Sequence, residues 1–188
     1  MQSNSAQAVV NRRSLFLVNT KSLVGAVLLG LVFVLVQQIA HRIDALINPA
    51  SVIIGGVTWA TFTGLIVLLY RQPAGLITAE VAAFTGLATG LSILAPFFIL
   101  ANGAGSIIYS LVAWKLPMKT WGHHFLAQLA TNLIGNFFVA VGLRVLLHLP
   151  TGVILIAAGI TTIAGVIGGT ILTKKIYESV NQAGLIQK

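Results

Sequence analysis

Acidic residues are rare in this chain, and one of them lies in an unusual place. Glu80 is one of only three Asp and Glu residues among 188, and it follows Arg71 and Pro73 inside the otherwise apolar stretch RQPAGLITAE. A carboxyl group in such surroundings can contact a ligand, carry a proton, couple two moving parts, or tie two helices together through a hydrogen bond. The residues alone leave these roles open.

Polar side chains that could recognise a ligand occur singly inside other apolar stretches. Asn132 and Asn136 are four residues apart and therefore share one face of a helix. Amide groups suit the ring nitrogens and hydroxyls of a heterocycle, an indole such as that of Trp59 can stack on its ring, and Glu80 can accept a hydrogen bond from an amino or hydroxymethyl group. The site we predict comprises Trp59, Glu80, Asn102, Asn132 and Asn136, with Gln38, His41 and Arg144 at its mouth.

Patterns typical of enzymes and metal sites are not found. The chain has no cysteine, its four histidines do not form HExxH or another known ligand spacing, and neither a Walker sequence nor a nucleophile elbow occurs. We therefore predict no metal, no cofactor and no enzymatic activity in this chain. The net charge of +8 is spread over the ends of the apolar runs, so we do not expect binding to nucleic acid.

The elements that must position these residues are long apolar runs. Hydrophobic residues make up 57% of the chain and charged residues 7%, against roughly a quarter charged in soluble domains. Each run approaches the roughly 20 residues that cross about 30 Å of hydrocarbon. The runs are Ser22–Ala40, Ser51–Tyr70, Pro73–Thr89, Leu91–Trp114, Phe125–His148 and Thr151–Thr173. We predict an all-α integral membrane protein with six transmembrane helices in one bundle that contacts the lipid bilayer.

Basic residues between and beyond the runs predict the orientation. With a cytoplasmic N-terminus, nine Lys and Arg residues lie inside and only Arg42 and Arg144 lie outside. Both termini should then be cytoplasmic. The predicted parts are a polar cytoplasmic segment at 1–20, a transmembrane substrate-binding domain at 21–175 and a cytoplasmic tail at 176–188.

The first run carries two further signals. Ala26 and Gly30 are small residues at four-residue spacing, which allows close helix approach, and we assign them to the contact with a partner helix. The outer end of this run contains Arg42 and Asp44. These two residues either form an ion pair at the membrane surface or belong to an extracellular gate that includes the following turn, LINPAS.

Three stretches resemble the substrate-binding S components of energy-coupling factor (ECF) vitamin transporters, in particular the YkoE-like branch. They are RQPAGLITAEVAA at 71–83, NGAGS at 102–106 with WK at 114–115, and KKIYESVNQAGLI at 174–186. The similarity can be followed from about residue 45 to the end. It implies a subunit of the bacterial plasma membrane that captures a vitamin or its precursor from outside. The implied partners are a transmembrane coupling protein (EcfT-type) and two cytoplasmic ATPase subunits, which would use the ATP.

For YkoE-like proteins the implied ligand is thiamine or its hydroxymethylpyrimidine part. This chain has Leu87 and Ile107 where relatives carry additional carboxylates. The loss of negative charge favours a neutral pyrimidine, or a pyridoxine-type vitamin B6 ligand, over intact thiamine. Two functions of other classes are a self-sufficient secondary transporter in which Glu80 carries a proton, and a membrane scaffold that transports nothing.

Overall fold

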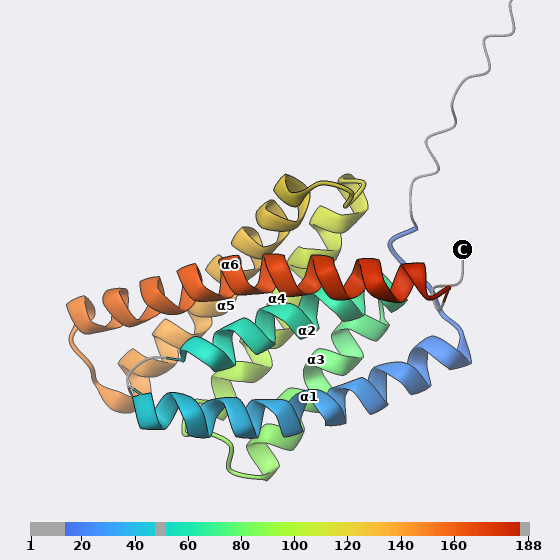
Figure 1. Ribbon diagram of the computed structural model, residues 1–188. Helices are drawn as coiled ribbons and strands as arrows, with labels where there is room; N and C mark the ends of the chain where they lie inside the picture. The colour runs from blue at the N-terminus through green and yellow to red at the C-terminus, as the bar shows by residue number, and fades with distance from the viewer. Residues whose placement is uncertain (1–13, 48–51, 185–188) are drawn as a thin grey trace, which may run out of the picture.

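The chain folds into helices, and the residues that the structure describes contain no β-sheet. The computed structural model describes residues 14–47 and 52–184. The helices in these ranges are α1 (Thr20–Ile47), α2 (Ile53–Tyr70), α3 (Ala74–Ala88), α4 (Ala95–Lys115), α5 (Trp121–Leu147) and α6 (Thr151–Gln182) (Figure 1). The predicted all-α fold is confirmed, and each of the six predicted runs forms a helix.

Five of the helices are long and apolar enough to cross a membrane, which indicates a multi-pass membrane protein. The exception is α3, whose 15 residues extend about 22 Å, less than the roughly 30 Å of bilayer hydrocarbon. Gly90 follows α3 in a left-handed conformation (φ 66°), and the Leu91 N–H donates to the Gly86 carbonyl (2.9 Å). This C-terminal cap ends α3 before it reaches the length of the other helices.

The fourth helix starts later than predicted. Residues 91–94 form a connection, and α4 begins at Ala95, with Pro96 in its first turn. Proline suits this position because the first helical N–H groups have no intrahelical acceptor. The α3–α4 connection therefore covers one end of the bundle instead of extending a transmembrane helix.

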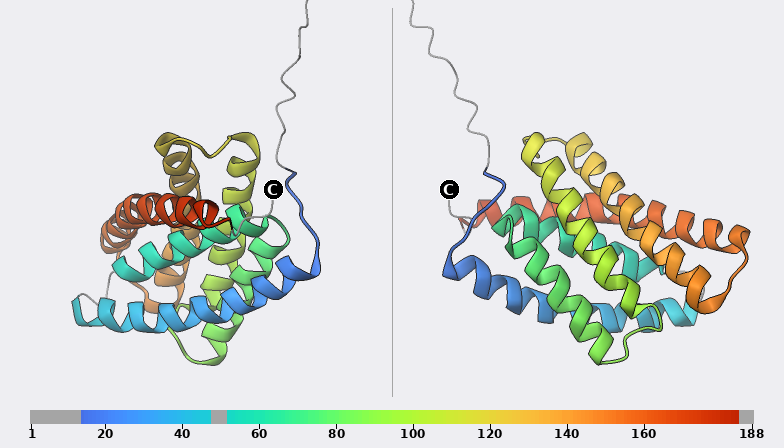
Figure 2. Two further views of the ribbon diagram at one scale, coloured as in Figure 1. Left: turned by 45° about the vertical axis from the view of Figure 1, so that its right-hand side comes forward. Right: turned by 180° about the vertical axis from the view of Figure 1, so that it is seen from behind.

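The centre of the bundle is α2, which contacts each of the other five helices. Around it, successive contacts run from α1 to α3, α4, α5 and α6 (Figure 2). Three glycines of α2 allow some of these close approaches; at Gly64, for example, a Cβ atom would lie 2.7 Å from the Thr173 side chain of α6. Small residues at helix contacts are typical of membrane bundles.

The last two helices extend beyond the predicted runs. The Thr120 side chain accepts a hydrogen bond from the His123 N–H and so caps α5, which begins at Trp121. His123 and His124, expected in a turn, thus lie in the first turn of α5, and His124 is buried against the Met118 carbonyl (3.1 Å). α6 continues to Gln182, so the predicted boundary between bundle and tail falls inside this helix.

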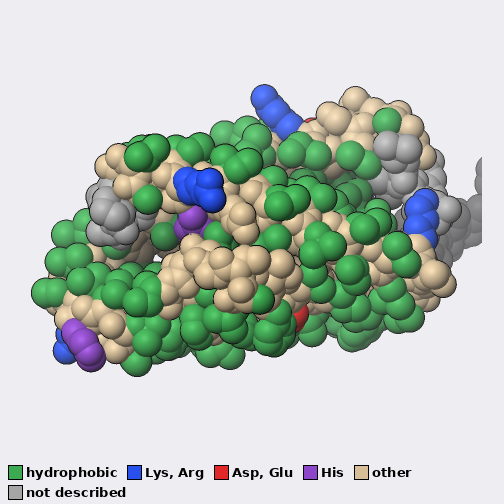
Figure 3. Space-filling model, turned by 90° about the horizontal axis from the view of Figure 1, so that it is seen from below, with side chains coloured by type: hydrophobic (Ala, Val, Ile, Leu, Met, Phe, Trp, Pro, Cys, Tyr) green, Lys and Arg blue, Asp and Glu red, His purple; other side chains and the backbone are tan. Residues whose placement is uncertain are grey.

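The outside of the bundle is mostly apolar. Large hydrophobic side chains are exposed along α1, α5 and α6, including Leu35, Phe137 and Ile163. Hydrophobic side chains cover most of the face seen in Figure 3, and Lys and Arg side chains occur only at scattered points. This surface suits contact with lipid, as the composition predicted.

Candidate ligand-binding cavity

A cavity of about 300 Å³ lies at one end of the bundle. It is bounded by the last turns of α1 and α5, the first turns of α2, α4 and α6, part of α3, and the α3–α4 connection. The start of α1 and the end of α6 lie at the opposite end (Figure 1). Its polar or aromatic lining residues are Phe33, Gln37, His41, Asp44, Trp59, Ser92, Phe98, Asn102, Asn136 and Thr161.

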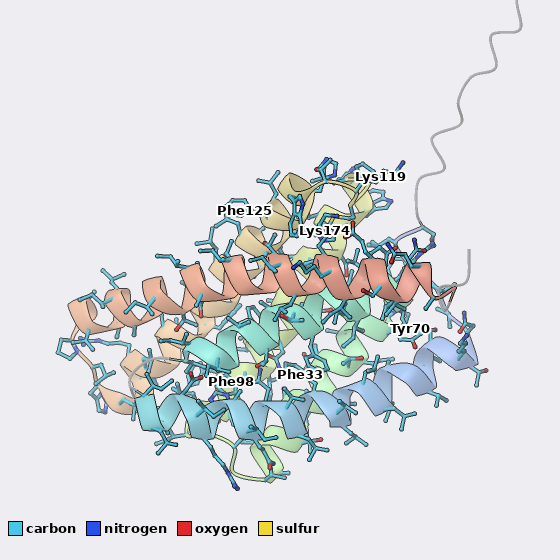
Figure 4. All side chains as sticks on the ribbon, viewed as in Figure 1. Phe33, Tyr70, Phe98, Lys119, Phe125 and Lys174 are labelled. Atoms are coloured by element: carbon cyan, nitrogen blue, oxygen red, sulfur yellow. The ribbon has the colours of Figure 1, made fainter. Side chains whose placement is uncertain are left out.

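Aromatic side chains form much of the wall. The His41 ring stacks on Phe98 with 5.7 Å between centroids and 19° between planes. Figure 4 shows Phe98 and Phe33 on the inner side of the bundle, between α1 and α2. Trp59 lies against Gly105 and Gly135, where any larger residue would collide with the indole. Because these two glycines have no side chains, the indole fits between α4 and α5 and forms part of the cavity wall.

Asp44 joins α1 to the start of α2. Its Oδ1 accepts a hydrogen bond from the Ile54 N–H and its Oδ2 from the Gly55 N–H, both at 2.8 Å. A carboxylate at a helix N-terminus satisfies free N–H groups and interacts favourably with the helix dipole. No ion pair with Arg42 is present among the described residues, so the predicted pairing is wrong. The turn at 48–51, the centre of the predicted gate, lies outside the described residues.

Two buried polar atoms in the cavity wall have no hydrogen-bond partner among the described residues. Gln37 donates from Nε2 to the Gly55 carbonyl (3.0 Å), but its Oε1 accepts nothing. The indole Nε1 of Trp59 is likewise unpaired. An unsatisfied buried polar atom costs about 1–3 kcal/mol, which a bound molecule or water can offset. Among its buried atoms, the wall thus holds one unused acceptor and one unused donor.

Four of the predicted site residues line the cavity: His41, Trp59, Asn102 and Asn136. The two amides are held by neighbouring helices. Asn102 donates from Nδ2 to the Ala79 carbonyl (3.3 Å), and Asn136 donates to the Thr162 hydroxyl (2.7 Å). Each amide NH₂ group uses one of its two N–H donors in these bonds, so its carbonyl oxygen and one N–H remain for a ligand.

Three predicted residues lie elsewhere. Asn132 is fully buried beneath the cavity, where its Nδ2 donates to the Gln128 carbonyl (2.8 Å). Gln38 turns away from the cavity and donates to the Thr89 hydroxyl (3.3 Å). Arg144 is exposed and donates to the Leu149 carbonyl (3.0 Å) at the end of α5. These side chains serve contacts within the bundle and do not line the cavity.

Glu80 is also absent from the cavity wall. It lies on the side of α3 that turns toward α4, and its Oε1 approaches Gly103 so closely that a Cβ atom there would collide with it. Its Oε2 is buried and has no hydrogen-bond partner in the described part of the chain. Glu80 therefore lies outside the cavity that four of the other predicted residues line.

Ala26 and Gly30 contact α3 of the same chain. The Thr78 hydroxyl donates to the Ala26 carbonyl (2.8 Å), and a Cβ atom at Gly30 would lie 2.8 Å from the Val81 side chain. Both small residues are buried. The close approach that they allow therefore brings α1 against α3, and the assignment to a partner helix is corrected.

Gln37 and Asp44 are among the cavity residues that the predicted site did not include. With Phe33 and His41 they follow one another at spacings of four, four and three, and so occupy one face of α1. This periodicity was a usable signal, since it separates Gln37 from its neighbour Gln38. The described lining contains Asp44 as an acidic group and no Lys or Arg, so it suits a molecule without negative charge.

No protein-family model, curated protein or solved structure matches this chain.

Proposed function

We propose that this protein is the substrate-binding S component of an ECF-type importer and that it captures a small heterocyclic vitamin or vitamin precursor. The observation that supports this proposal is the cavity. It lies at the end of the bundle away from the start of α1 and the end of α6. The distribution of Lys and Arg favours the outside for that end, and we place the protein in the bacterial plasma membrane as part of this proposal. A molecule arriving from outside thus meets the cavity first.

The size and lining of the cavity support a single-ring ligand. A volume of about 300 Å³ is at the lower end of the range for small-molecule sites. Trp59, His41 and Phe98 offer flat surfaces for stacking, and the oxygens of Asn102 and Asn136 accept hydrogen bonds. An aminopyrimidine such as hydroxymethylpyrimidine matches this set, because its amino group is a donor and its ring is flat. Pyridoxine is the alternative ligand.

Uptake against a gradient then requires partner subunits. This chain contains no nucleotide-binding motif, so ATP hydrolysis belongs to two cytoplasmic ATPases that act through a transmembrane coupling protein. The contact with the coupling protein involves surfaces other than Ala26 and Gly30, which α3 already covers.

Isothermal titration of the purified protein in lipid nanodiscs tests the proposal. Hydroxymethylpyrimidine, pyridoxine and thiamine are titrated separately. The variant Ala158→Phe places a ring in the cavity, and Ala164→Phe is its control on the same helix, at a similarly half-buried position outside the lining. We expect the wild type and Ala164→Phe to bind hydroxymethylpyrimidine or pyridoxine, and Ala158→Phe to bind neither.

The same preparation separates the alternatives. Equal binding by Ala158→Phe and the wild type would contradict a role for the cavity. Uptake by this chain alone in proteoliposomes under a pH gradient would support a secondary transporter instead. If neither these compounds nor any small molecule released from the purified protein is found bound, a scaffold is the better account.

A further inference from the structure

The outward sides of α3 and α4 form a surface in which one carboxyl group lies among apolar side chains. Phe84 and Leu87 of α3 and Leu100 and Ile107 of α4 are exposed, and Glu80 lies beside them, partly buried. The right-hand view of Figure 2, seen from behind Figure 1, shows the two helices side by side on the face toward the viewer. We call these five residues the α3–α4 surface. None of them lines the cavity.

Glu80 lies far from both ends of its helix. It is six residues from Ala74, about 9 Å along the axis, and eight residues from Ala88. Within α3 and α4 the only basic residue is Lys115, which is the last residue of α4. The ion pair present among the described residues joins Lys174 to Glu178 of α6. The described residues therefore supply Glu80 with no cation.

The free energy of a carboxyl group at this depth depends on its ionisation and on the groups that pair with it. An ionised carboxylate near the middle of a bilayer costs a few kcal/mol or more unless it is paired. A protonated carboxyl group avoids that cost but leaves an O–H donor and a buried acceptor without partners in hydrocarbon. A cationic side chain from another helix removes both penalties. A second copy of this chain that met this surface with its own α3–α4 surface would bring another carboxyl group and no cation.

We propose that the α3–α4 surface binds a transmembrane helix of a different protein, which brings an Arg or Lys side chain to Glu80. The exposed apolar side chains pack against that helix, and the absence of a side chain at Gly103 lets the Glu80 carboxyl group lie against α4 between them. Charge complementarity selects this partner over a purely apolar helix. The inference stands independently of what the cavity binds.

Resonance energy transfer in lipid vesicles tests this inference with defined probes. The full-length protein carries a donor dye, and synthetic Leu/Ala helices of about 20 residues carry an acceptor dye. One helix has Arg at its centre and the other has Leu there. We expect the Arg helix to associate at least about tenfold more tightly, and this preference to disappear in Glu80→Gln. Glu178→Gln, the same change outside the surface, should retain it.

A second variant controls for misfolding of Glu80→Gln, and a crosslinking experiment detects self-association through this surface. Gly103→Leu places a side chain where the Glu80 carboxyl group lies against α4, so it displaces the carboxyl group without removing it, and it should also abolish the preference for the Arg helix. Equal association of the two helices, or an unchanged preference in Glu80→Gln, would overturn the proposal. The chain has no cysteine, so disulfide-linked dimers of Leu100→Cys in native membranes would report a second copy on this surface and would overturn it as well.

Discussion

Replacing Asp44 by Asn should loosen the attachment of α2 to α1. The two carboxylate oxygens accept from Ile54 N–H and Gly55 N–H at 2.8 Å each, in a residue that is only 3% exposed. An amide keeps one acceptor and turns its NH₂ group toward the other N–H, so one of the two bonds is lost. A hydrogen bond to a charged group contributes about 1.5–3 kcal/mol, and we expect a loss of about 2–3 kcal/mol in the free energy of unfolding.

The assay measures unfolding by SDS in mixed micelles, and circular dichroism monitors the loss of helix. Asp44→Ala removes both bonds and should lose about 3–5 kcal/mol, somewhat less than two full bonds because water reaches the N–H groups from the cavity. Glu178→Gln is the control. The Glu178 side chain is 48% exposed, and an amide oxygen in its place still accepts a hydrogen bond from the buried Lys174 one helical turn away, so we expect a loss of about 1 kcal/mol or less. If Asp44→Asn were no more destabilising than Glu178→Gln, the carboxylate would not be the group that holds α2 in place.

Three further outcomes are expected. Trp59→Leu should weaken hydroxymethylpyrimidine binding about tenfold in calorimetry, because aromatic stacking contributes about 0.5–1.5 kcal/mol; unchanged affinity would remove the indole from the site. Gly30→Ala should lower the free energy of unfolding by about 1–3 kcal/mol, since its Cβ would meet Val81, whereas Gly159→Ala, which meets nothing within 4 Å, should not. Gln128→Leu should lose about 1–3 kcal/mol in the SDS assay, because it deletes hydrogen bonds to α2 and α6; a neutral effect would show that these bonds are dispensable.

The helices were predictable because hydrophobic length is a direct consequence of the bilayer. Runs near 20 residues had to form helices, since backbone groups in hydrocarbon must bond within their own segment. Helix ends were less predictable. The start of α4 at Ala95 depends on the cap at Gly90, and the extension of α6 to Gln182 depends on helix-forming polar residues that hydropathy does not reveal.

The candidate site was predicted in part because polarity and membrane depth do not reveal which way a side chain points. Asn132 and Asn136 share a face, yet one bonds beneath the cavity and the other lines it. Glu80 was the most conspicuous polar residue and lies outside the site. Asp44, predicted at the membrane surface, turns inward because the free N–H groups of α2 attract its carboxylate. Such choices depend on helix rotation, which the contacts between helices determine.

Ligand binding in the cavity can be observed directly through Trp59. The chain has three tryptophans, and replacing Trp114 and Trp121 by Phe leaves the indole of the cavity wall as the only one. Titration of this protein with hydroxymethylpyrimidine should give a saturable change in Trp59 fluorescence, and the same titration should give none when Ala158→Phe is added. Saturable binding that leaves Trp59 fluorescence unchanged, or that survives Ala158→Phe, would contradict a vitamin-binding cavity at this end of the bundle.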